Sequence, residues 1–108
     1  MKFQIDSVGY QQDMDGNFHP SISLLNENVA AELYDHPSEG WQVIYLGEGI
    51  LPRYVDYRDD VAQHVFESHY GELNFAHCAA IAADLREMGR DKAYVKWVGQ
   101  TIELQEDK

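Results

Sequence analysis

The sequence predicts an α+β fold, in which an antiparallel β-sheet (a meander of about four to six strands) packs against an α-helical hairpin. Two observations support this prediction: strand-like segments fill the amino-terminal half, and two helical segments follow before the pattern becomes extended again. No early strand is followed by a crossover helix, which argues against a parallel nucleotide-binding sheet. A chain of 108 residues suits one core, so we expect residues 1–108 to form a single compact domain.

The clearest structural signal is a helix over residues 74–88. Its apolar residues recur at steps of three and four, as on one helix face. They are Phe75, Cys78, Ile81, Ala82, Leu85 and Met88. Asn74 is suited to cap the first turn, and Gly89 is suited to end the last one. A thiol on an apolar stripe is usually inert, so we expect Cys78 to be buried and unreactive.

A second helix is expected just before this one, over residues 57–70. Asp56 is the predicted cap, and Gly71 is the predicted stop. The expected core-facing stripe consists of Tyr57, Val61, His64, Val65 and Ser68. Because only three residues separate the two helices, we expect them to form an antiparallel pair.

Extended segments flank the helices, and turn-forming residues separate most of them. We predict strands at residues 2–12, 18–25, 29–34, 41–46 and 93–104. Residues 29–34 could also form a short helical turn, but the turn signals at both ends favour a strand. Gly99 and Gln100 have the composition of a two-residue turn that would divide the last segment into two strands. Residues 47–55 contain a glycine break followed by an apolar connection.

The chain is strongly acidic, and its charge is uneven. It carries 19 acidic and eight basic residues, a net charge of −11, and residues 1–52 contain only Lys2 as a base. Nucleic acid and anionic membranes would repel such a chain. If charge directs binding, the partner must be basic; the alternative is that acidity only maintains solubility.

The cysteine count, the first residues and the lack of long apolar segments indicate in which cellular compartment the protein resides. Its single cysteine allows no internal disulfide. The first residues include an acid and form no apolar run, which differs from a signal peptide. No segment approaches the length of a membrane span. We therefore expect a cytoplasmic protein that does not bind membranes.

No pattern typical of catalysis or cofactor binding is complete. A zinc site needs three or four converging ligands, which the five histidines do not supply by their spacing. Residues 13–17 resemble the start of a calcium loop, but the glycine comes at the fourth position rather than the sixth, and Leu24 stands where the loop needs its final glutamate. Residues 47–49 lack the third glycine of a dinucleotide-binding loop. We expect no metal, no cofactor and no catalytic site.

These observations favour a small non-enzymatic interaction module that inhibits or regulates a partner by binding its basic surface. In size and acidity, the chain resembles small phage or mobile-element proteins that block nucleic-acid-handling complexes. We expect no direct binding to nucleic acid. Acids provide steering, and aromatic residues provide buried anchors. The candidate partner-binding residues are Asp13, Asp15, Glu32, Tyr34, Asp35, Glu39, Trp41, Tyr45 and Glu48.

Two alternatives belong to other classes of protein. The first is a small enzyme or ligand-binding domain that uses His64, Glu67 and His69 beside a tyrosine-lined cleft. Convergence of these three side chains in a deep pocket would favour it. The second is a homodimer, because seven tyrosines and two tryptophans could form a self-complementary interface.

Overall fold

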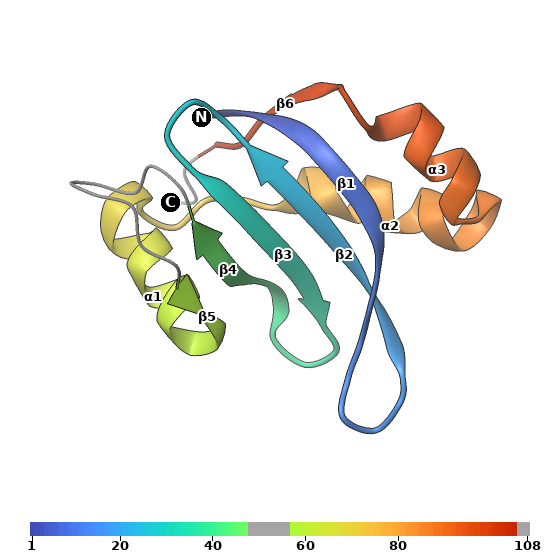
Figure 1. Ribbon diagram of the computed structural model, residues 1–108, viewed down its shortest axis with the longest axis horizontal. Coiled ribbons are helices and arrows are strands. Elements are labelled where there is room, and N and C mark those ends of the chain that lie inside the picture. The colour runs from blue at the N-terminus through green and yellow to red at the C-terminus, as the bar shows by residue number, and fades with distance from the viewer. Residues whose placement is uncertain (48–56, 106–108) are drawn as a thin grey trace.

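A computed structural model describes residues 1–47 and 57–105 (Figure 1). Within these ranges, the strands form one antiparallel sheet in the order β5-β4-β3-β2-β1-β6. The strands are β1 (Lys2–Gln12), β2 (Phe18–Leu25), β3 (Ala30–His36), β4 (Gly40–Gly47), β5 (Tyr57–Arg58) and β6 (Thr101–Glu103). The helices are α1 (Asp59–Tyr70), α2 (Ala76–Met88) and α3 (Arg90–Trp97). The α+β class and the antiparallel meander are therefore confirmed.

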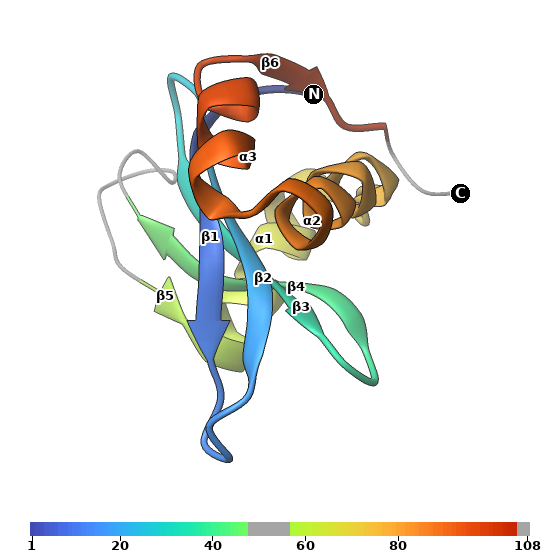
Figure 2. The ribbon, with the colours of Figure 1, turned by 90° about the vertical axis from the view of Figure 1, so that its right-hand side faces the viewer.

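One face of the sheet and the three helices enclose a single hydrophobic core. Alternating strand residues point into it, including Ile22 and Leu24 of β2, and helix residues such as Phe66 and Ile81 fill it from the other side. In Figure 1, α2 passes behind β1 and β2, while α1 lies beside β4. The view in Figure 2 shows α3 next to α2 at the β1 side of the sheet.

A β-bulge in β1 brings the buried side chains before and after it onto the same face of the sheet. Strict alternation after Phe3 and Ile5 would place Val8 on the opposite face. The pairing of β1 with β2 shifts between Ile5 and Ser7, so one extra residue is accommodated. Phe3, Ile5 and Val8 consequently all point into the core and are buried.

The predicted core-facing stripe of α1 is wrong at three of its positions, whereas Val65 packs against the core as expected. Val61 is 54% exposed, and His64 and Ser68 are also exposed. The buried residues are Ala62 and Phe66, and the ring of Phe66 lies 5.1 Å from that of Tyr70. Residues spaced by four, namely Ala62, Phe66 and Tyr70, therefore form the buried face, because α1 packs against β4.

The two predicted helices follow each other closely, as expected, but they cover different parts of the sheet. The main packing partner of α1 is β4, whereas α2 packs against α3, β1 and β2. Gly71 ends α1 with a positive φ of 74°, and its N–H donates to the carbonyl oxygen of Glu67 at 2.8 Å. The predicted cap Asp56 and most of the connection after Gly47 lie outside the described residues.

The residues predicted to begin and end α2, Asn74 and Gly89, lie at its two ends. The helix begins at Ala76, whose N–H donates to Asn74 Oδ1 at 2.8 Å. Gly89 separates α2 from α3 with a φ of 87°, which favours glycine. None of the helices among the described residues combines the length and the apolar character needed to cross a membrane.

The prediction that residues 93–104 are extended is wrong for the part before Gly99 and confirmed for the part after Gln100. Residues Arg90–Trp97 form α3, and the strand β6 covers only Thr101–Glu103. The helix buries Ala93 fully, and two residues of its last turn contact Asp84 of α2. These tertiary contacts outweigh the strand propensity of the segment containing Tyr94, Val95 and Trp97.

Candidate partner-binding surface

The candidate residues divide between the two faces of the sheet. Successive residues of β3 alternate, so Glu32 and Tyr34 point away from the helices, while Asp35 lies on the helix side. We call the face opposite the helices the open face; its residues include Ser7, Gly9, His19, Ser21, Ser23, Glu32, Tyr34 and Tyr45. Glu48 lies outside the described residues.

Tyr34 lies between two histidine rings on the open face. Its ring centroid is 5.3 Å from that of His19 and 6.0 Å from that of His36, and both contacts are edge-on. Burial raises the pKa of the Tyr34 hydroxyl, and the charges of Asp13 and Asp35 add to this effect. The hydroxyl therefore remains protonated and can donate a hydrogen bond.

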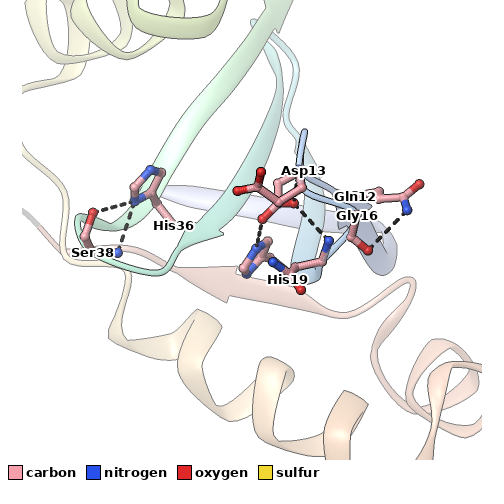
Figure 3. Close-up of polar contacts among 8 residues, drawn as sticks. Gln12, Asp13, Gly16, His19, His36 and Ser38 are labelled. Carbon is pink, nitrogen blue, oxygen red and sulfur yellow. Dashed lines mark hydrogen bonds and ion pairs between the residues drawn. The ribbon is translucent and has the colours of Figure 1, made fainter.

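The carboxylate of Asp13 organises the turn between β1 and β2 (Figure 3). It accepts hydrogen bonds from the N–H groups of Asp15 and Asn17, both at 2.9 Å, and lies 2.7 Å from His19 Nε2. The hydrogen bond with His19 contributes most to a lowered pKa of Asp13, followed by that from Asn17. Asp13 is thus engaged within its turn, whereas Asp15 is exposed.

On the helix side, the three remaining candidates lie near the β3–β4 turn. Asp35 is directly opposite Trp41, and its Oδ2 atom lies 3.5 Å from Arg86 Nη2 of α2. Arg86 therefore partly neutralises Asp35. Trp41 is half-buried against the core, and Glu39 lies in the turn beside it.

Glu39 and Trp41 line a pocket of about 300 Å³ between the β3–β4 turn, α1 and the α1–α2 connection. We call it the acidic pocket. Its lining includes three carboxylates and three aromatic rings, and none of its described residues is basic. Those residues are Glu39, Trp41, Gln63, Phe66, Glu67, Gly71, Glu72, Leu73 and Phe75. The three carboxylates come from three separate segments.

Gln63 links the acidic pocket to the edge of the sheet. Its Oε1 atom accepts a hydrogen bond from the Val43 N–H at 2.6 Å, which satisfies a backbone group of β4. Its Nε2 atom donates to Glu67 Oε1. Glu67 is therefore held in place before any ligand arrives, which lowers the entropy lost on binding.

His36 holds the β3–β4 turn, which contributes Glu39 to the acidic pocket (Figure 3). Its Nδ1 atom accepts hydrogen bonds from the N–H groups of Ser38 at 3.1 Å and Glu39 at 3.2 Å. This arrangement requires Nδ1 to be unprotonated. The turn that carries Glu39 is thus held by the preceding strand.

Several pocket residues were not among the sequence-based candidates. Glu72, Phe66 and Phe75 come from segments that pattern analysis assigned to the helices and their connection. Glu67 was considered only with His64 and His69, which are exposed and do not line the acidic pocket. The three side chains proposed for a catalytic or ligand site therefore do not converge there.

The acidic pocket has the chemistry of a cation site. Carboxylates form strong charge-assisted hydrogen bonds with ammonium and guanidinium groups, and aromatic faces attract the same cations. Among the described residues, no group of three or more His, Cys, Asp or Glu side chains is arranged to hold a metal ion.

Comparisons with protein-family models, curated proteins and solved structures found no match for this chain.

Proposed function

We propose that this protein is a non-enzymatic interaction module that binds a basic segment of a partner protein. One observation carries the proposal: Glu39, Glu67 and Glu72 bring three carboxylates from different segments to one aromatic-lined pocket. An arginine or lysine side chain of the partner would enter this pocket. The net charge of −11 would accelerate its approach.

The pocket adds an anchor to this long-range attraction. Exposed ion pairs contribute only about 0–1 kcal/mol each, so surface acidity alone gives weak binding. A cation shielded by aromatic rings gains roughly 0.5–2 kcal/mol more from the ring faces. Trp41 and Phe75, which are only partly buried, supply such rings, whereas Phe66 lies in the core beneath them.

In this proposal, the partner's basic surface is one that otherwise contacts phosphates. Proteins that handle nucleic acid carry lysine and arginine clusters for this purpose. An acidic protein that covers such a cluster competes with nucleic acid without binding it. We therefore propose that the module inhibits or regulates a nucleic-acid-handling complex, in the manner of small phage or mobile-element proteins.

Binding of defined basic peptides tests the proposal. The variant E39Q/E67Q/E72Q removes three charges from the pocket, and E27Q/E87Q/D91N removes three exposed charges elsewhere, none of them at a candidate residue. Fluorescence anisotropy with lysine- and arginine-rich peptides should show a loss of at least about tenfold for the pocket variant, since charge-assisted bonds are lost. The control variant should lose less than about threefold. Equal losses in both variants would show that total charge, rather than the pocket, determines binding.

A further inference from the structure

A second pocket lies on the open face of the sheet, separate from the acidic pocket. Its volume is about 210 Å³, and its lining combines hydroxyl groups with one acidic and one basic side chain. The residues that matter to the argument are Ser7, Gly9, Ser21, Ser23, Glu32 and Arg90. We call this site the serine pocket.

Arg90, the first residue of α3, supplies the positive charge. A Cβ atom placed on Gly9 would lie 3.5 Å from Arg90 Nε, so the side chain rests directly over the β1 backbone. Its described contacts are loose: Asp91 Oδ1 lies 3.8 Å away, and the Tyr94 ring centroid lies 5.3 Å from Cζ. The guanidinium group therefore retains donors for a ligand.

Glu32 of β3 supplies the negative charge, with serines of the neighbouring strands beside it. Ser23 is paired with Ser7 on one side and with Glu32 on the other, and Ser21 is paired with Gly9. Within the described part of the chain, no ion pair within 4.0 Å joins Glu32 to Arg90. Glu32 and Arg90 are thus opposite charges that line one small site without neutralising each other directly.

Ser21 is unusually buried among the polar residues of the serine pocket. It is a polar residue with only 9% of its surface exposed, on a sheet face where none of the described residues belongs to the core. Its hydroxyl donates to Glu32 Oε1 at 3.5 Å, well beyond the 2.7–2.8 Å typical of such bonds. A hydroxyl this buried normally has a closer partner, so it has hydrogen-bonding capacity left for a ligand.

We propose that the serine pocket binds a small zwitterion of the amino-acid class. The ligand carboxylate would pair with the guanidinium fork of Arg90, and its ammonium group would pair with Glu32. The serine hydroxyls can both donate to and accept from the ligand. A simple anion would be repelled by Glu32, and a simple cation by Arg90. The volume lies below the roughly 300–1,000 Å³ of sites for larger ligands, which fits a single amino acid.

Titration with free amino acids tests this site directly. Amide cross-peaks of Ser21, Ser23 and Glu32 in ¹H–¹⁵N spectra should shift saturably with at least one of the standard amino acids. Its N-acetyl derivative and its methyl ester each lack one charge, so both should bind at least about tenfold more weakly. Absence of any saturable shift would overturn the proposal. Equal binding of the N-acetyl derivative would also overturn it, because the site would then be a plain anion site.

Charge variants provide a second, independent test. E32Q and R90Q should each weaken amino-acid binding by at least about tenfold. R86Q is the matched control, since Arg86 pairs with Asp35 on the other face of the sheet. The double reversal E32R/R90E restores one charge of each sign and should bind better than either single reversal. A double variant that binds no better than the single ones, while retaining the wild-type melting temperature, would contradict the assignment.

Discussion

Asp13, Asp35 and Glu39 are all acidic residues of the amino-terminal half, yet their carboxylates have different surroundings. Asp13 is bonded to its own turn and to His19, and Asp35 faces Arg86. Glu39 instead lines a pocket whose described residues include no base. The charge pattern of the sequence identified all three, but only the fold distinguishes an engaged carboxylate from one positioned for a partner.

Cys78 provides a residue-scale prediction. Burial raises the pKa of its thiol to about 12, and the nearby charge of Asp35 contributes in the same direction. Since the thiolate is the reactive form, Cys78 should be almost inert to a thiol reagent in the folded protein at neutral pH. Labelling followed by mass spectrometry should be slow in buffer and fast in denaturant. Equally fast labelling in both conditions would contradict the predicted burial of the α2 stripe.

At the scale of elements, α3 is the largest departure from the sequence prediction. Asp84 of α2 connects the two helices through Oδ2, which lies 2.7 Å from Lys96 Nζ and accepts a bond from Trp97 Nε1 at 2.8 Å. These contacts position the last turn of α3 against α2. They join residues 12 or 13 positions apart in the chain. The local pattern of strand-forming residues therefore could not predict these contacts.

Removal of the Asp84 charge tests the role of this connection. Lys96, and secondly Trp97, lower the pKa of Asp84 in the folded protein. Its stabilising effect should therefore be fully present above the ordinary aspartate pKa and be lost as the pH falls through the lowered value. D84N should melt below the wild type at pH 7, and the difference should shrink below about pH 4. Asp91, whose side chain is fully exposed, provides the control D91N. A deficit independent of pH would contradict the electrostatic explanation.

The predictable and unpredictable parts of the fold differ in the range of the interactions that determine them. Alternation and turn residues located β1 and β2 within their observed bounds, and helical spacing identified the buried stripe of α2. The buried face of α1 and the helical state of α3 depend on packing against β4 and α2. Of the residues that line the acidic pocket, the sequence indicated only Glu39 and Trp41 as binding candidates, because Glu67 and Glu72 reach the pocket only after α1 packs on the sheet.

For the molecule as a whole, the helices and one face of the sheet enclose the core, and two binding candidates lie outside it. The acidic pocket lies on the helix side, where the β3–β4 turn meets α1. The serine pocket lies on the open face. They share no residue, so binding at one can be measured while the other is altered. The acidic pocket is central to the proposed function because it combines the charge of the chain with aromatic anchors.

The two tryptophans allow this central claim to be tested within one spectrum. Trp41 lines the acidic pocket, whereas the indole N–H of Trp97 is bonded to Asp84 between α2 and α3. We would titrate the ¹⁵N-labelled protein with a short peptide carrying one arginine, and with the same peptide carrying citrulline, its uncharged analogue. The arginine peptide should shift the Trp41 indole cross-peak saturably and leave that of Trp97 in place, and the citrulline peptide should shift neither. An unmoved Trp41 cross-peak, or equal shifts with both peptides, would contradict cation binding in the acidic pocket.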